Sequence, residues 1–259
     1  MDSLLAFLQS PFLSQPTWLW LLFISIVLTV LVLDLGVFNR KDHVIGPVES
    51  MKTAAAYIAI GLTFGAWVWW DLGADKAVEY YTGYLLELTL ALDNVFVISL
   101  ILAYFAVPRE LQHRVLFWGI LGVIVLRAIM IGVGAALVAN FAWIRYTFGA
   151  FLLFTGAKML KESFSSDAEE AKDLTDNALL KWLRNHLRVS DGFRGSRFFV
   201  KEPHPASGKL VLFVTPLFLA LVLVEFADLV FAIDSVPAIF AITQDPYIVY
   251  TSNIFAILG

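Results

Sequence analysis

Cysteine is absent from the 259 residues, and charged residues make up only 15% of the chain. Without thiols the chain can form no disulfide, bind no metal through sulfur and perform no sulfur redox chemistry. Any metal ion must therefore be held by oxygen or nitrogen. The histidines fall in polar stretches or at their edges, and we expect them to be solvated and not to bind an ion: His43, His113, His186 and His204.

Hydrophobic residues make up 59% of the chain, far above the usual balance of soluble proteins. Apolar runs of about eighteen residues or more recur, and each is long enough to cross a hydrocarbon core of about 30 Å as a helix. These runs predict transmembrane helices near residues 17–38, 52–70, 81–107, 114–138, 141–160 and 210–243, with a seventh beginning near Val249. The first run has no basic leader and no small-residue cleavage site, so we interpret it as a retained span.

Basic residues are concentrated in the loops that follow the first, third and fifth predicted helices. The segment from Lys158 to Lys209 is the richest, whereas the opposite side has only Lys76 and Arg145. Because basic loops favour the cytoplasmic side, the amino terminus is expected outside the cell.

The polar segment 161–209 is then a cytoplasmic loop. Within it Leu180, Leu183 and Leu187 share one face of a predicted helix, and basic residues share another. Two interpretations stay open, an amphipathic helix on the anionic membrane surface and a short helix in a solvated linker.

One pattern occurs twice in the chain. Residues 87–95 read ELTLALDNV and residues 228–236 read DLVFAIDSV, and ILG at 120–122 recurs at 257–259. The two copies lie in predicted spans that cross the membrane in opposite directions, so the repeat is inverted. Inverted repeats are a recurring architecture of transporters, which bind substrate near the midplane where the halves meet.

The fold predicted from these features is an all-α, polytopic transmembrane helix bundle with an inverted repeat. Residues 1–160 form a first repeat of about five helices, 161–209 a cytoplasmic loop, and 210–259 the start of the second repeat. No counterpart of the Arg127 helix follows Gly259. We therefore expect the second repeat to be incomplete at its C-terminal end, with apolar surface left uncovered around the last long helix.

Acidic residues inside these apolar spans are the candidates for a functional site. Each costs about 2.5–3.5 kcal/mol at a helix centre even on a lenient insertion scale, so they must face an interior. Arg127 is the only basic residue at comparable depth. A bound divalent cation would balance part of the remaining charge. The alternative, protonated carboxyls or a purely structural cluster around Arg127, stays open.

Pro237 predicts one further oxygen ligand, a backbone carbonyl. Its ring nitrogen cannot donate to the carbonyl of Ile233, which predicts a broken helix with a free carbonyl near Asp234. Carboxylate, amide, hydroxyl and carbonyl oxygens suit Mg²⁺, Ca²⁺ or Mn²⁺. The predicted metal-binding residues are Glu87, Asp93, Asn94, Glu225, Asp228, Asp234 and Ser235, with Asp34 and Arg127 as accessory residues; Asp34 has an equally favoured interpretation as an interfacial residue.

Three stretches resemble the TerC/Alx family of membrane proteins, which are associated with tellurite resistance and manganese efflux. They are residues 87–97 (ELTLALDNVFV), 146–159 (YTFGAFLLFTGAKM) and 224–259 (VEFADLVFAIDSVPAIFAITQDPYIVYTSNIFAILG). The resemblance implies a bacterial inner-membrane protein that exports Mn²⁺. Members of this family continue through further helices beyond the last motif.

The function expected from residues and resemblance together is Mn²⁺ efflux by alternating access, with proton exchange through the same carboxylates. The expected partners are membrane lipid, the divalent cation and protons, with no nucleic acid and no tightly bound cofactor. A non-transporting membrane scaffold that assists insertion, assembly or stress resistance is the alternative. No nucleophile with an adjacent base is evident, so we do not expect an enzyme.

Overall fold

The computed structural model describes residues 2–34, 46–141, 143–164, 178–203 and 208–259. Its helices are α1 (Asp2–Gln9), α2 (Thr17–Leu33), α3 (Pro47–Leu72), α4 (Ala74–Tyr104), α5 (Arg109–Asn140), α6 (Trp143–Phe164), α7 (Ala178–His186), α8 (Pro216–Ile242) and α9 (Pro246–Leu258). Two short antiparallel hairpins are formed by β1 (Pro11–Phe12) with β2 (Gln15–Pro16) and by β3 (Phe199–Pro203) with β4 (Leu210–Val214).

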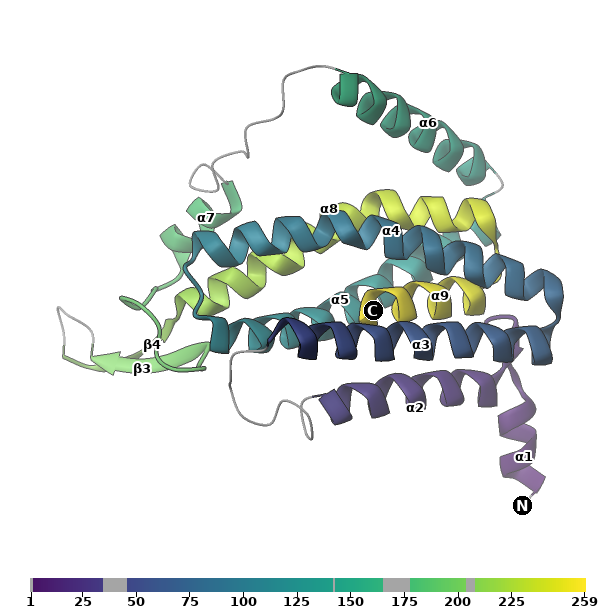
Figure 1. The fold of residues 1–259 in the computed structure, drawn as a ribbon, viewed down its shortest axis with the longest axis horizontal. Helices are drawn as coiled ribbons and strands as arrows, with labels where there is room; N and C mark the ends of the chain where they lie inside the picture. The colour runs from purple at the N-terminus through teal and green to yellow at the C-terminus, as the bar shows by residue number, and fades with distance from the viewer. Residues whose placement is uncertain (1, 35–45, 142, 165–177, 204–207) are drawn as a thin grey trace.

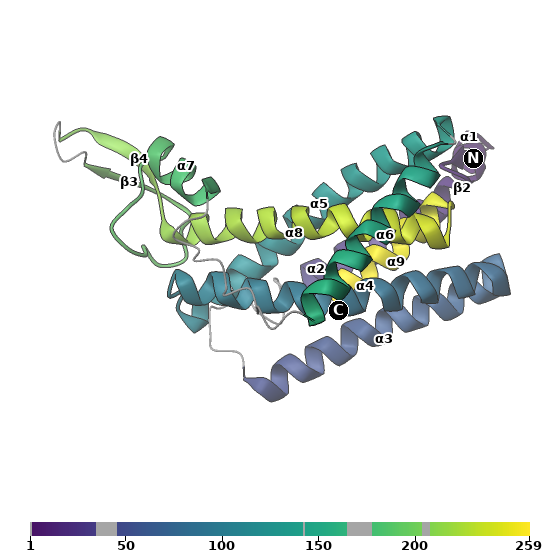
Figure 2. The same ribbon diagram turned by 90° about the horizontal axis from the view of Figure 1, so that it is seen from above.

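Helices occur where the apolar runs predict them, but α6, which covers the predicted span 141–160, is not among the described helices that are long and apolar enough to cross a membrane. By length and composition α3, α4, α5 and α8 are each able to cross a membrane, and α2 and α9 are shorter apolar helices. The four long helices lie side by side along the long axis of the molecule, and α6 lies at the edge of the bundle next to α8 (Figures 1 and 2). The all-α membrane fold is therefore confirmed.

Two details of the predicted last long helix are wrong. Residues 210–214 form a strand paired with β3, and the helix begins only at Pro216, which restricts Thr215 to extended backbone. The predicted break at Pro237 is also absent, because α8 is continuous from Pro216 to Ile242. Pro237 removes a single helical hydrogen bond. Residues 235–237 are buried, and packing against neighbouring helices keeps the segments before and after Pro237 in one continuous helix.

The helix directions agree with those expected for the repeat. Helices α4 and α8 pack against each other and run in opposite directions (Figure 1). Helices α5 and α8 run in the same direction, with Gly119 beside Val224 and Gly134 beside Phe240. Helices α4 and α9 are also parallel to each other and in contact (Figure 1). The pair α8 and α5 thus has the same arrangement as the pair α4 and α9, although the division into two repeats stays a prediction.

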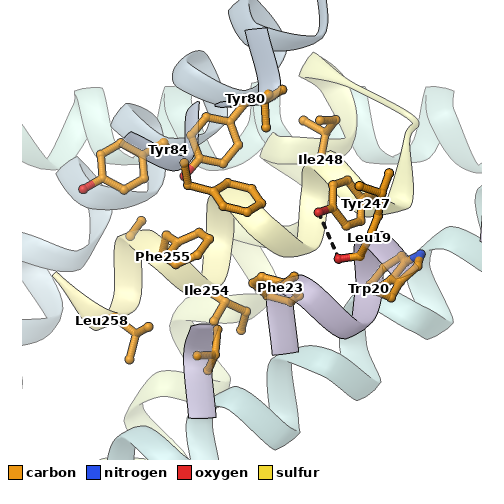
Figure 3. Packing of buried hydrophobic residues seen from close by; sticks show 14 of the residues in the cluster. Leu19, Trp20, Phe23, Tyr80, Tyr84, Tyr247, Ile248, Ile254, Phe255 and Leu258 are labelled. Carbon is orange, nitrogen blue, oxygen red and sulfur yellow. Dashed lines mark hydrogen bonds between the residues drawn. The ribbon is translucent and has the colours of Figure 1, made fainter. Parts of the chain in front are cut away.

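An aromatic cluster joins α2, α4 and α9 at one end of the bundle. Trp20 and Phe23 of α2 pack edge-on against Tyr247 of α9, while Tyr80 of α4 is fully buried behind them (Figure 3). The Tyr247 hydroxyl donates to the Leu19 carbonyl over 3.3 Å. These contacts position α9, which carries one residue of the site described below.

The polar loop predicted at 161–209 contains α7 and the strand β3. Leu180 and Leu183 of α7 are buried in a cluster with Leu217 of α8 and Val115 of α5. The leucine face of α7 therefore packs against other helices of the protein. This packing supports neither of the two interpretations, a helix that inserts its leucines into the membrane surface or a short helix in a solvated linker. The acidic stretch within 165–177, His43 and His204 lie outside the described residues.

Candidate functional site

Arg127, from the middle of α5, is the centre of a buried polar network. Its side chain is 1% exposed, and its Nε and Nη2 atoms donate to the two carboxylate oxygens of Asp228 over 3.3 Å and 2.8 Å. Nη1 donates to the Glu87 carboxylate. One guanidinium therefore binds a carboxylate from each copy of the repeated motif.

Two polar side chains complete this network. Arg127 Nη1 also donates to the Ser235 hydroxyl over 3.1 Å and to Asn253 Oδ1 over 3.2 Å. Asn253 Nδ2 in turn donates to the second oxygen of Glu87 over 2.9 Å. We call Glu87, Arg127, Asp228, Ser235 and Asn253 the Arg127 network, and it joins α4, α5, α8 and α9.

The spacing of the motif explains which predicted residues reach this network. Seven residues turn an α-helix by almost two full turns, so Glu87 and Asn94 share one stripe of α4, and Asp228 and Ser235 share one stripe of α8. The two helices are antiparallel, and Gly83 lies against Ile239. Counting from that contact brings Glu87 level with Ser235.

Asn94 and Asp228 come level by the same count, about 10 Å further along the two helices. The Asn94 Oδ1 atom is buried and has no hydrogen-bond partner. Glu225, one turn before Asp228, has a buried Oε2 atom that also has no partner. Two oxygen acceptors of this region thus lack a donor.

Asp93 and Asp234 each lie one residue, or about 100°, from these stripes. The Asp93 side chain is exposed on the surface of the chain, and Asp234 is half-buried. Neither belongs to the Arg127 network. In the part of the chain that the structure describes, no three histidine, aspartate or glutamate side chains are arranged to hold a metal ion.

Asp34 lies apart from the Arg127 network. It is buried at the end of α2 and its Oδ2 atom lies 3.1 Å from His113 Nε2. His113 precedes Arg127 by about 21 Å of helix rise on α5. The expectation that His113 is simply solvated is therefore wrong, because its ring pairs with a buried carboxylate.

Asn253 is the member of the Arg127 network that was not predicted from the sequence. It is fully buried and binds both Arg127 and Glu87. The available signal was an amide inside the apolar segment 246–258, since a buried amide needs partners for its donors and acceptor.

Comparison with known proteins identifies the family. Residues 72–259 match the model of the integral membrane protein TerC family. The chain belongs to the TerC family. Both copies of the repeated motif, and every residue of the Arg127 network, lie within the matched region.

Several curated relatives support this membership. An uncharacterised membrane protein of Myxococcus xanthus is 46% identical over 241 residues, which cover 93% of this chain and 72% of the relative. An uncharacterised membrane protein of Rickettsia bellii is 45% identical, covering 93% of this chain and 76% of the relative. The Escherichia coli relative named Alx (membrane-bound redox modulator) is 45% identical, covering 93% of this chain and 74% of its own length. No solved structure matches the chain.

Proposed function

We propose that this TerC family protein transports divalent cations across the bacterial inner membrane, and that it exports Mn²⁺. The observation that carries the proposal is the meeting of Glu87 and Asp228, the leading acids of the two motif copies, at one buried centre. Two carboxylates in a membrane interior are costly to keep, and such residues commonly mark ion pathways. Their position between antiparallel helices fits substrate binding where inverted repeats meet.

The charges of the Arg127 network suggest how a cation enters. Glu87 and Asp228 carry two negative charges and Arg127 one positive charge, so the network has a net negative charge when all three are ionised. Arg127 holds the carboxylates in the observed arrangement. A divalent cation would take over its role as their counter-ion, with the unpartnered oxygens of Asn94 and Glu225 as further ligands.

The choice of Mn²⁺ rests on the donor atoms and on the family. An all-oxygen set suits Mn²⁺, Mg²⁺ or Ca²⁺, and the resemblance to manganese efflux proteins favours the first. Some relatives are named as redox modulators. If that role depended on thiols, this chain would need another mechanism, because its 259 residues contain no cysteine. An amino terminus outside the cell belongs to the same proposal.

Metal flux into liposomes that contain the purified protein tests this function. We expect the wild-type protein to admit Mn²⁺ to a trapped indicator, and Glu87→Gln and Asp228→Asn to abolish that flux. Glu110→Gln is the matched control, because Glu110 is exposed in the first turn of α5.

Gel filtration and circular dichroism of each variant separate lost transport from lost folding. The proposal fails if the wild-type protein adds no flux to empty liposomes, as expected of a scaffold. It also fails if both folded core variants transport like Glu110→Gln.

A further inference from the structure

One face of α4 carries an acid at a depth where lipid would otherwise surround it. Asp93 is exposed on the surface of the chain, and Leu92 and Phe96 beside it are 68% and 66% exposed. All three lie inside a helix that is long and apolar enough to cross a membrane. An aspartate that faces lipid within a span is costly even on a lenient insertion scale. We therefore expect protein to cover this face.

Helix α6 lies over this face, but its second half does not pack on it. Figure 2 shows α6 crossing over α8, with the end of α6 above α4. Figure 1 shows the same end lifted away from α4 and α8. The two helices that α6 contacts are α8 and α5. The gap between α6 and α4 thus leaves Asp93 uncovered.

The face of α6 that meets α8 changes from buried to exposed along the helix. Five residues recur every three or four positions and so share one stripe of α6: Ile144, Phe148, Phe151, Thr155 and Lys158. Ile144 is 8% exposed, and the Phe148 ring lies 6.4 Å from the Phe240 ring of α8. Further along the stripe, Phe151 and Thr155 are half-buried and Lys158 is exposed. The first half of α6 is therefore anchored, and the second half diverges.

The exposed end of this stripe carries a cation to the depth of Asp93. By the count between α4 and α8 used above, Phe240 is level with position 82 of α4. Helices α4 and α6 run in the same direction (Figure 1). Asp93 lies about 16 Å beyond position 82 along α4, and Lys158 lies about 15 Å beyond Phe148 along α6. Closing the gap would therefore bring Lys158 to Asp93.

We propose that α6 is a hinged arm that closes onto α4 and α8 and pairs Lys158 with Asp93. The anchored half around Ile144 and Phe148 is the pivot, and the second half swings toward α4. Closure replaces the contact of Asp93 with lipid by an ion pair within the protein, and it buries the rest of the stripe. The inference concerns the packing of the bundle, and it holds whether or not the protein transports an ion.

Distances between two spin labels test this closure in the full chain in liposomes. The chain has no native cysteine, so labels attach only at Thr89→Cys on α4 and Thr155→Cys on α6, which are level by the same count. We expect two populations of distances, one of them with the labels close together. The matched control pair, Thr89→Cys with Trp143→Cys at the anchored start of α6, should keep a single distance.

The close population should depend on both charges. Asp93→Asn and Lys158→Gln should each lower it severalfold, and the exchange Asp93→Lys with Lys158→Asp should restore it. Asp75→Asn, at an exposed position near the start of α4, should leave it unchanged.

Three results would overturn the inference. A single long distance in the otherwise wild-type chain would show that α6 does not close. A close population that survives both single substitutions would show that the ion pair does not hold the arm. A close distance between one chain labelled only at position 89 and another labelled only at 155 would show that a second copy covers this face instead.

Discussion

Arg127 of α5 links four helices, because its side chain donates hydrogen bonds to residues of α4, α8 and α9. A guanidinium has five N–H donors in a fixed plane, so it can bind two oxygens of Asp228 and still reach Glu87, Ser235 and Asn253. Lysine offers a single ammonium group and cannot reproduce this geometry. The network is therefore sensitive to the shape of the cation as well as to its charge.

Substitution of Arg127 should destabilise the protein in a graded order. Arg127→Gln leaves Glu87 and Asp228 buried without a cation, and breaking such a pair costs about 3–5 kcal/mol. Arg127→Lys should lie between this variant and the wild type. Thermal unfolding in detergent measures the order, with Arg109→Gln as control because Arg109 is exposed at the start of α5. Equal melting temperatures for Arg127→Gln and Arg109→Gln would contradict the structural role of the network.

The candidate site was only partly predictable from the sequence. Membrane energetics identified the buried acids Glu87 and Asp228, because an unpaired charge is so costly in an apolar span. Asp93 and Asp234 were predicted as ligands together with these acids, but they lie about 100° away from the stripes that the seven-residue spacing defines. Asn253 was missed because it has no counterpart in the repeated motif, and its role depends on the tertiary packing of α9 against α4.

At the scale of the elements, the corner between α8 and α9 is tied to the N-terminal hairpin. Asp245, the N-cap of α9, accepts from the Tyr247 backbone N–H over 3.1 Å. The same carboxylate accepts from Ser14 over 3.0 Å and from Gln15 Nε2 over 3.2 Å. Lys76 of α4 lies 3.6 Å from it. One side chain thus joins the hairpin, α4 and α9.

Removing this cap should loosen both the start of α9 and the hairpin. Asp245→Ala is expected to cost about 1 kcal/mol, the typical value of an N-cap side chain. Hydrogen exchange should rise at residues 11–16 and in the first turn of α9, while α5 is unchanged. Asp75→Ala, at an exposed position in α4, serves as control. Unchanged exchange at both segments would show that Asp245 does not hold them together.

The helices themselves were largely predictable because long apolar runs leave few alternatives to a membrane-spanning helix. The errors fall where short-range and tertiary effects compete. Leu210–Val214 is as apolar as a span, yet it pairs with β3 because Pro216 sets the helix start. Pro237 reads as a helix breaker in isolation, whereas packing around residues 235–240 keeps α8 continuous.

At the scale of the whole molecule, the two ends of the bundle differ in chemistry. The start of α4 and the corner between α8 and α9 lie at one end, and the β3–β4 hairpin with α7 lies at the other (Figure 1). The second end holds a high density of basic residues, including Arg184, Arg188 and Lys201. Basic segments near spans are retained in the cytoplasm, so this end should face inward.

Single cysteines at the two ends should therefore react from opposite sides of the membrane. The chain has no native cysteine, so each introduced thiol reports one position. We expect a membrane-impermeant maleimide to label Asp75→Cys in intact cells and to label Lys201→Cys only after the membrane is opened; both positions are exposed. Position 172, another informative site in the predicted cytoplasmic loop, lies outside the described residues. Labelling of 201 but not 75 would reverse the orientation and leave the antiparallel arrangement intact. Labelling of both from outside would refute the inverted repeat. Helices α4 and α8 would then both start at the outer side and cross the membrane in the same direction, whereas an inverted repeat requires opposite directions.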